Sequence, residues 1–202
     1  MTEEEARDWV ANHFDPATVR RLAALADLVV AANAQQNLIA PSTVDQIWSR
    51  HIVDSLQLLH LAQPGRWLDV GTGAGFPGLV IAAAEPDREV VMIEPRRLRV
   101  DHLRQCSEVL DLRVASVIHG KADTQSIISA VISARAVATL ASVFGMAKGC
   151  ADLSTAWLLP KGRNAESELA EARRKWHGVF HVEQSITSPD SSIIVAREVK
   201  AR

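Results

Sequence analysis

The chain has 202 residues, enough for a single domain with a small appendage that buries about 70% of the surface of its unfolded state. Its 22 Lys and Arg residues and 24 Asp and Glu residues give a net charge of −2, which excludes nucleic-acid binding through bulk positive charge, so that any such contact requires a local patch. A hydrophobic share of 48%, with 23% charged residues, excludes a disordered or fibrous chain.

No apolar run approaches the length of a membrane span. The longest, Leu79–Ala84, is far below the roughly 18 to 20 residues that a bilayer requires. The acidic segment Met1–Glu5 lacks the basic and apolar regions of a secretion signal, so we expect a cytoplasmic protein with no membrane partner. Cys106 and Cys150 lie far apart and outside any Cys-x-x-Cys pattern, which predicts buried, reduced thiols.

The first 62 residues have apolar side chains at helical spacing and predict an N-terminal helical cap over residues 1–62. Two apolar faces are expected, one made by Val19, Leu22, Ala26, Val29 and Val30, and one made by Trp48, Ile52, Leu56 and Leu59. Pro41, within residues 37–42, separates the two helical stretches because proline cannot continue a helix there.

From residue 63 to residue 202 short β-branched runs alternate with helical stretches. The expected strands are 67–70, 90–93, 114–118, 131–133, 157–159, 180–184 and 193–195, and the expected helices are 79–84, 96–110, 138–149 and 164–176. This alternation predicts an α/β fold with a Rossmann-like, mostly parallel sheet covered on both faces. The last two strands follow each other without a helix, which predicts an antiparallel hairpin at one edge. We expect cap and sheet to form one compact unit.

The most informative stretch is Leu68–Gly78, in which a strand leads through a glycine-rich turn into a helix. Gly73, Gly75 and Gly78 satisfy the dinucleotide spacing G-x-G-x-x-G, but this spacing alone is a weak signal. The glycines indicate that ligand atoms approach the backbone where the first strand ends.

Two acids lie at strand ends, and the first of them suggests which ligand is bound. Asp69 is expected to face the crevice, where a carboxylate repels a pyrophosphate and attracts a cationic nucleoside such as S-adenosylmethionine. The alternative for Asp69 is a structural carboxylate that caps the amides of the turn. Glu94 ends the second strand and is placed to accept ribose hydroxyls of either cofactor, or it is a plain acid before a helix.

The same segments, in the same order, resemble the RsmG family, also called glucose-inhibited division protein B, whose members methylate small-subunit ribosomal RNA. The matching residues are Asn37–Leu38, Arg50–Leu56, Asp69–Gly78, Arg135–Ala136 and Leu159–Gly162. The resemblance implies transfer of a methyl group from S-adenosylmethionine to N7 of a guanine in 16S ribosomal RNA. By position, the cofactor contacts that the resemblance implies fall on Gly71, Phe76, Ala122, Asp123 and Arg135, with Glu94 as the ribose acid. Gly73, in the glycine loop, is also expected to contact the cofactor.

Guanine N7 has a free lone pair at neutral pH, so the reaction needs no general base, and positioning should supply most of the rate. We expect Arg50, His51 and Asp54 to lie over the cofactor, with Arg50 on an RNA phosphate and His51 stacking on or hydrogen-bonding to the target base. The alternative is a polar network that fixes the cap to the core.

Further cations are candidate RNA contacts. Arg96 and Arg97 begin the densest basic stretch, which with Arg99, Arg104, Arg20 and Arg21 would supply the local phosphate patch that a near-neutral protein requires; the alternative is a solvated surface without a ligand. Lys161 is expected to reach RNA, although a plain surface cation is the alternative. Lys121–Asp123 would bracket an adenine edge or form a solvated loop. No metal site is predicted.

The expected partner is small-subunit ribosomal RNA or the 30S particle, and the expected state is a monomer. Two other functions fit parts of the pattern. A nicotinamide-dependent oxidoreductase would use the same glycine loop, and a noncatalytic ribosome-assembly factor would keep the fold but bind RNA only.

Overall fold

The computed structural model describes residues 1–202. The amino-terminal region is helical, as predicted, and its helices are α1 (Glu3–His13), α2 (Pro16–Gln36), η1 (Pro41–Gln46), η2 (Trp48–Val53), α3 (Asp54–Leu56) and η3 (Gln57–Leu61). The break between the two stretches is confirmed, because α2 ends at Gln36 and Asn37 takes a left-handed φ of 48°. This conformation is one that Asn tolerates and that ends helices.

Local capping explains where the first two helices begin. The Thr2 hydroxyl accepts a hydrogen bond from the Glu5 amide at 3.2 Å, and the Glu5 carboxylate accepts one from the Thr2 amide at 2.7 Å, which is a capping box. Asp15 caps α2 by accepting hydrogen bonds from the Ala17 and Thr18 amides. Leu22, Ala26 and Val29 are buried as predicted, but Val30 is 39% exposed, so its assignment to the buried face is wrong. Val30 follows Val29 directly, and neighbouring residues on a helix point about 100° apart.

All seven predicted strands are present: β1 (Trp67–Val70), β2 (Val90–Glu94), β3 (Ala115–His119), β4 (Val131–Ser133), β5 (Ala156–Lys161), β6 (Trp176–Gln184) and β7 (Ser192–Ala201). They form one sheet in the order β3-β2-β1-β4-β5-β7-β6. Strands β1 to β5 pair in parallel and β7 pairs antiparallel with both β5 and β6, which confirms the mostly parallel sheet with an edge hairpin. β6 begins at Trp176 rather than at Phe180 because it pairs with β7 as far as Ala201.

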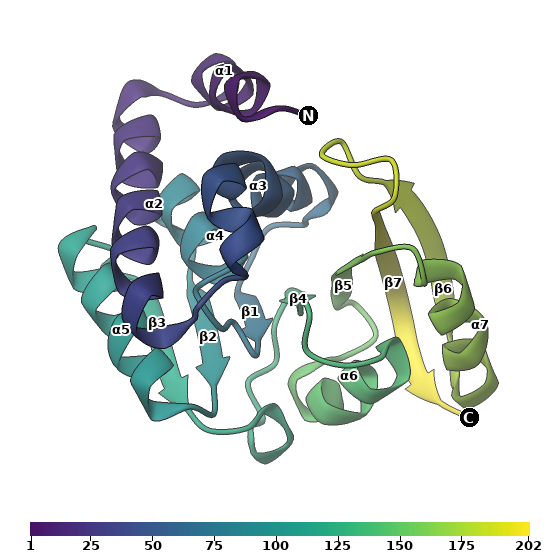
Figure 1. The fold of residues 1–202 in the computed structure, drawn as a ribbon. Helices are drawn as coiled ribbons and strands as arrows, with labels where there is room; N and C mark the ends of the chain where they lie inside the picture. Colours follow the sequence, from purple (N-terminus) through teal and green to yellow (C-terminus); the bar gives the residue numbers. More distant parts are fainter.

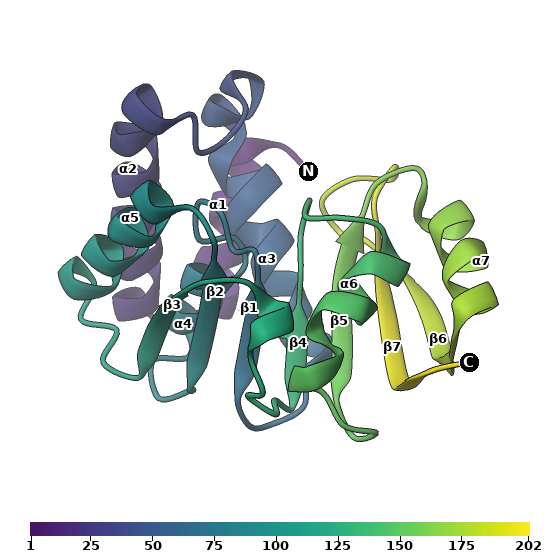
Figure 2. The same ribbon diagram turned by 90° about the horizontal axis from the view of Figure 1, so that it is seen from below.

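Helices cover both faces of the sheet (Figures 1 and 2). The predicted helices are α4 (Gly78–Ala84), α5 (Arg97–Val109), α6 (Leu140–Ala147) and α7 (Ala165–Lys175). The short turn η5 (Lys148–Cys150) continues α6 at the end of the predicted helix 138–149, and only η4 (Ala122–Thr124) was not predicted. One apolar cluster joins the cap to α4, α5 and one sheet face, and a second joins α6 and α7 to the other. The first cluster contains residues on both sides of the expected boundary between residues 62 and 63, so the cap and the sheet share one core.

The two cysteines, Cys106 and Cys150, are buried and free, as predicted. None of the helices combines the length and the apolar character needed to cross a bilayer.

We predict that Gly75→Ala destabilises the fold by about 1 to 3 kcal/mol, measured by urea unfolding. Gly75 has φ +100°, which strains any other residue, and a Cβ atom there would lie 2.4 Å from Cδ1 of Leu79, in the buried core. Gly162→Ala is the matched control, because a Cβ at Gly162 meets nothing within 4 Å. Equal stability of the two variants would contradict this account of the glycine-rich turn after β1.

A candidate cofactor and substrate site

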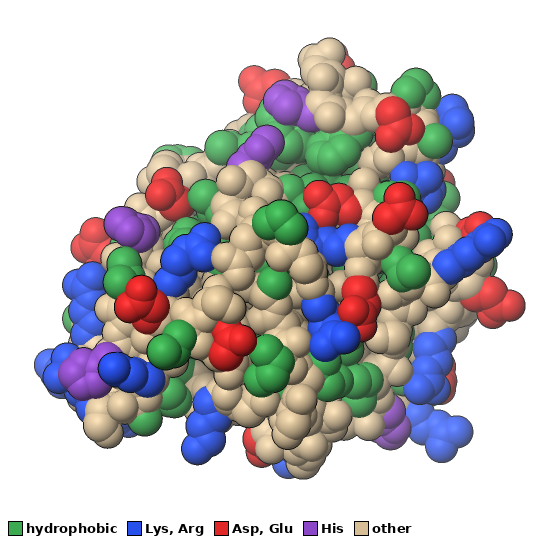
Figure 3. Space-filling view, turned by 180° about the vertical axis from the view of Figure 1, so that it is seen from behind, with side chains coloured by type: hydrophobic (Ala, Val, Ile, Leu, Met, Phe, Trp, Pro, Cys, Tyr) green, Lys and Arg blue, Asp and Glu red, His purple; other side chains and the backbone are tan.

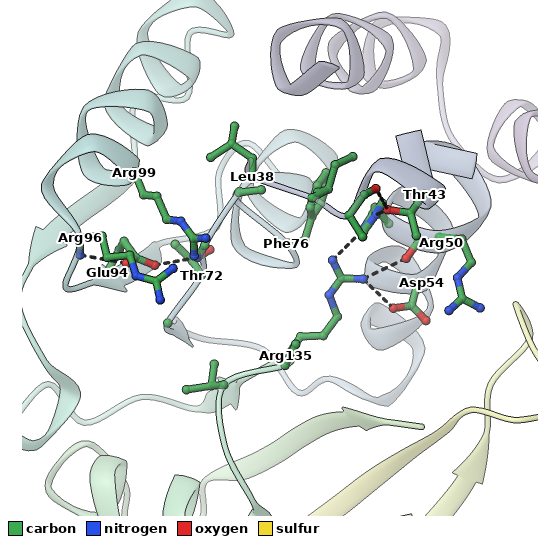
Figure 4. A pocket seen from close by; sticks show the side chains of 18 of the residues that line it. Leu38, Thr43, Arg50, Asp54, Thr72, Phe76, Glu94, Arg96, Arg99 and Arg135 are labelled. Atoms are coloured by element: carbon green, nitrogen blue, oxygen red, sulfur yellow. Dashed lines mark hydrogen bonds and ion pairs between the residues drawn. The ribbon is translucent and has the colours of Figure 1, made fainter. Parts of the chain in front are cut away.

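A cavity of about 570 Å³ opens at the carboxyl ends of β1, β2 and β4 (Figure 4). β1 lies between β2 and β4, so this is the point where the strand order reverses, which is where open α/β sheets bind ligands. The cap forms the other wall. The lining includes Leu38, Ile39, Ala40, Thr43, Arg50, His51, Asp54, Gly71, Thr72, Gly73, Ala74, Phe76, Glu94, Pro95, Arg96, Arg99, Arg135, Ala136, Val137, Thr187 and Ser191.

Gly71 and Gly73 line the cavity with left-handed φ angles of +65° and +61°. The Gly71 amide donates to the Ile93 carbonyl oxygen at 2.8 Å, which ties the loop to β2. A Cβ atom at Gly71 would lie 2.8 Å from Cγ2 of Val137, so only glycine lets the loop after β4 approach this closely. The loop therefore presents bare backbone to a ligand, as its sequence predicted.

Asp69 lies below the cavity and does not line it. Its side chain is fully buried, and it accepts hydrogen bonds from the Gly78 amide at 2.9 Å and the Ser133 hydroxyl at 2.7 Å. Burial raises the pKa of Asp69 to about 6. The prediction that this carboxylate faces the crevice and contacts the cofactor is wrong, and the alternative, a carboxylate that caps the turn, describes its contacts.

Glu94 lines the cavity at the end of β2. One carboxylate oxygen accepts from the Gly73 amide at 3.0 Å and the other from the Arg96 amide at 2.9 Å. Glu94 thus joins the glycine loop to the start of α5. A carboxylate has about four acceptor positions, so Glu94 keeps about two for the hydroxyls of a ligand.

Arg135 follows β4 and extends toward the cap, where it contacts three of the predicted residues (Figure 4). One guanidinium nitrogen donates to Asp54 Oδ2 at 3.0 Å and to the Arg50 carbonyl oxygen at 2.9 Å. The other donates to Nδ1 of His51 at 2.7 Å. The structure therefore has the polar network that fixes the cap to the core, and it brings Arg135 to the same wall of the cavity.

His51 is held as a neutral ring. Since Nδ1 accepts from Arg135, the ring proton lies on Nε2, 2.9 Å from the Thr43 hydroxyl. Burial, and after it the charges of Arg135 and Arg50, lowers the pKa of His51 to about 3. The ring also stacks on Phe76, with centroids 4.8 Å apart. The expectation that His51 stacks on an RNA base is wrong for that face, because Phe76 occupies it.

Three predicted contacts lie elsewhere. Ala122 is buried, Asp123 is exposed, and neither lines the cavity. Lys161 donates to the Ala138 carbonyl oxygen at 2.7 Å and pairs with Glu168 at 2.9 Å, with its side chain 10% exposed. Its predicted contact with RNA is therefore wrong, because its charge is neutralised inside the protein.

Of the predicted cations, Arg50 and Arg96 are exposed and line the mouth of the cavity, whereas Arg97 is exposed outside it. Arg99, from the same basic stretch, also lines it. Arg21 is not free for RNA, since it donates to the Ala83 carbonyl oxygen and the Thr18 hydroxyl. Thr43, Thr187 and Ser191 were missed, because nothing in their local sequence marks them.

We predict that His51→Gln changes the pH dependence of stability between pH 6 and pH 4. The neutral ring stabilises the fold above the unfolded pKa of about 6.5, and this stabilisation is lost as the pH falls toward 3. Asp69 acts oppositely, since its raised pKa gives stability that is present below pH 3.8 and lost as the pH rises through 6.

The free energy of unfolding of His51→Gln, relative to that of the unsubstituted chain, should therefore rise by about 1.4 kcal/mol per pH unit as the pH falls from 6 to 4. Urea titrations at pH 6, 5 and 4 measure this difference. A difference that does not change with pH would contradict a neutral His51.

Solved structures with low sequence identity share the fold. The PH0226 protein from Pyrococcus horikoshii has a TM-score of 0.61 at 12% identity, with 82% of this chain and 95% of that chain covered. The precorrin-6y C5,15-methyltransferase from Geobacter metallireducens has a TM-score of 0.53 at 12% identity, with 80% and 91% covered.

Sequence relatives are much closer. The ribosomal RNA small subunit methyltransferase G of Novosphingobium aromaticivorans is 47% identical, covering 98% of this chain and 89% of its own length. The protein of the same name from Erythrobacter litoralis is 43% identical, covering 97% and 96%. The family model of GidB, rRNA small subunit methyltransferase G, matches residues 18–194. The resemblance of the motifs is thus confirmed, and the chain belongs to the rRNA small subunit methyltransferase G family.

Proposed function

We propose that this chain transfers a methyl group from S-adenosylmethionine to 16S ribosomal RNA of the small subunit, with N7 of a guanine as the acceptor. The observation that carries the proposal is a cavity at the switch point of the sheet, with bare glycine backbone and the Glu94 carboxylate on one wall. The names of the relatives give the RNA, and the resemblance of the motifs gives the acceptor atom.

The residues present fit the cofactor. The two acceptor positions left on Glu94 match the two hydroxyls of a ribose, and Gly71 and Gly73 leave room for the rest of the nucleoside. When bound, S-adenosylmethionine supplies a methyl group on a positively charged sulfur. Asp69 acts indirectly, by holding the start of α4 and β4 in place below the loop.

The cap side of the cavity suits a base that becomes positively charged on methylation. A cation beside the purine would oppose the reaction. His51 is neutral, and the charge of Arg135 is paired with Asp54 at 3.0 Å. The chain's own contribution is thus to orient the base and to limit positive charge beside the base. The reaction needs no proton acceptor, because guanine N7 has a free lone pair.

The RNA backbone would meet the arginines at the mouth. The side chains of Arg50, Arg96 and Arg99 have no ion-pair partner, and Arg97 pairs only at 4.0 Å with Asp101. On the face in Figure 3 the basic and acidic side chains are interspersed, without a single basic field. We propose that Arg50, Arg96 and Arg99, the arginines at the rim of the cavity, form the local phosphate patch. We also propose that the protein acts in the cytoplasm, as a monomer, on ribosomal RNA or the 30S particle.

The proposal predicts that incubation with methyl-labelled S-adenosylmethionine and small-subunit ribosomal RNA yields 7-methylguanosine, identified by mass analysis of the nucleosides. RNA that binds equally well with and without cofactor and stays unmodified would instead support a noncatalytic assembly factor. Tight calorimetric binding of NADH, with none of S-adenosylhomocysteine, would support an oxidoreductase.

A second prediction concerns the rim. Arg50→Ala should weaken RNA binding about tenfold at low salt and lower the dependence of log K on log salt by about 0.7 to 1, because one phosphate contact is lost. Binding of S-adenosylhomocysteine and the melting temperature should not change. Arg113→Ala is the charge-matched control, since Arg113 is exposed, pairs with Asp111 and does not line the cavity. Unchanged RNA affinity with a lower melting temperature would assign Arg50 a structural role.

A further inference from the structure

The turn between β6 and β7, residues 185–191, reaches the cavity although its two strands form the far edge of the sheet. Thr187 and Ser191 line the cavity. In Figure 1 this turn lies near the amino terminus and the cap, and the Met1 amino group donates to the Thr187 carbonyl oxygen at 3.3 Å. The edge hairpin therefore contributes to a site that otherwise consists of the cap and the parallel strands.

The buried side chain of Gln57 binds the turn to the cap at two points. Its amide nitrogen lies 3.2 Å from the Ser185 hydroxyl, and its amide oxygen accepts from the Ile186 amide at 3.0 Å. The Ser185 hydroxyl in turn accepts from the Thr187 amide at 3.2 Å. These contacts place the Thr187 side chain, which is 6% exposed, against Asp54.

Three segments set the orientation of the Asp54 carboxylate. Oδ1 accepts from the Thr187 hydroxyl at 3.2 Å and from the Gln57 amide nitrogen at 3.0 Å. Oδ2 accepts from Arg135. The Thr187 hydroxyl is the one donor to this carboxylate that comes from the hairpin, and it constrains the rotation of the group that holds Arg135.

Arg135 is directly sensitive to that rotation. Its guanidinium lies 5.4 Å from the ring centroid of Phe76, in the glycine loop, and its second nitrogen fixes the proton of His51 on Nε2. A small displacement of Asp54 would therefore change both the cap wall and the contact with the glycine loop. Displacements of about 1 Å are enough to cost up to 100-fold in rate.

We infer that Thr187 is a positioning residue for methyl transfer: it orients Asp54, Asp54 orients Arg135, and Arg135 with His51 forms the wall against which the acceptor base lies. This inference rests on the proposed function for its substrate. It assigns the β6–β7 turn to the substrate site, and Thr187 itself transfers no proton and contacts no cofactor.

The test compares Thr187→Val, which removes the hydroxyl and keeps the shape, with Thr187→Ser, which keeps the hydroxyl. Ser188→Ala is the matched control on the same turn, because the Ser188 hydroxyl bonds only to the Asp190 amide. We expect kcat for RNA methylation to fall about 10-fold to 100-fold in Thr187→Val, with the Kd for S-adenosylhomocysteine within about twofold. Thr187→Ser should recover most of the rate, and Ser188→Ala should match the unsubstituted chain.

A second readout does not depend on activity. The nitrogen-15 shift of His51 Nδ1 reports its hydrogen bond from Arg135 and should change in Thr187→Val but not in Thr187→Ser or Ser188→Ala. Absence of methylation by the unsubstituted chain would contradict the proposed function, while the nitrogen shift would still decide the inference. Should Thr187→Val fail to fold, Thr187→Ala replaces it in both measurements. An unchanged kcat, or an unchanged His51 shift, in the hydroxyl-lacking variant would overturn the role of Thr187.

Discussion

The cap side of the site depends on the hydrogen bonds and the ion pair that the Arg135 guanidinium makes with the cap. This guanidinium binds a carboxylate, a ring nitrogen and a carbonyl oxygen of the cap from a loop more than 80 residues away in the chain. Side chains of Arg135 and Asp54 are only 18% and 12% exposed, so both charges have lost much of their hydration. In such a setting, removal of one partner leaves the other buried and unpaired, which is costly, and the pair therefore specifies one arrangement of cap and sheet.

The two walls of the cavity have different electrostatic characters that follow from this arrangement. On the sheet side, Glu94 forms no ion pair and holds the glycine loop through backbone amides. On the cap side, the positive charge is paired with Asp54 and the histidine is neutral. The unpaired positive charge lies at the rim, on Arg50, Arg96 and Arg99. This division suits a cationic nucleoside inside and a polyanion outside.

The sequence was sufficient to predict the elements of the fold, because they depend on local patterns. The seven strands follow from short β-branched runs, the cap from helical spacing, and the glycine loop from its position between a strand and a helix. Glu94, His51, Asp54 and Arg135 were found by their positions at strand ends or by the resemblance of their motifs. The errors at Val30 and at the start of β6 came from limits of the same patterns, which do not fix the edge of a buried face or the length of a pairing strand.

The roles that were wrong or missed depend on contacts between distant segments. Whether Asp69 faces the crevice or α4 is decided by the Gly78 amide and by Ser133 on β4. Lys161 is neutralised by Glu168, and no charge count distinguishes it from a free cation. Thr187 lies 133 residues from Asp54 in the chain, and its neighbours are ordinary turn residues. A single sequence contains no signal for such pairs.

The most direct test of the central claim is a double-mutant cycle of Arg135→Gln and Asp54→Asn, with kcat for methylation of small-subunit ribosomal RNA as the measured quantity. If Asp54 acts by holding Arg135, the double variant should lose no more activity than the worse single variant, because the second substitution removes an interaction that is already broken. Losses that multiply would show that the two residues act independently and would contradict the account.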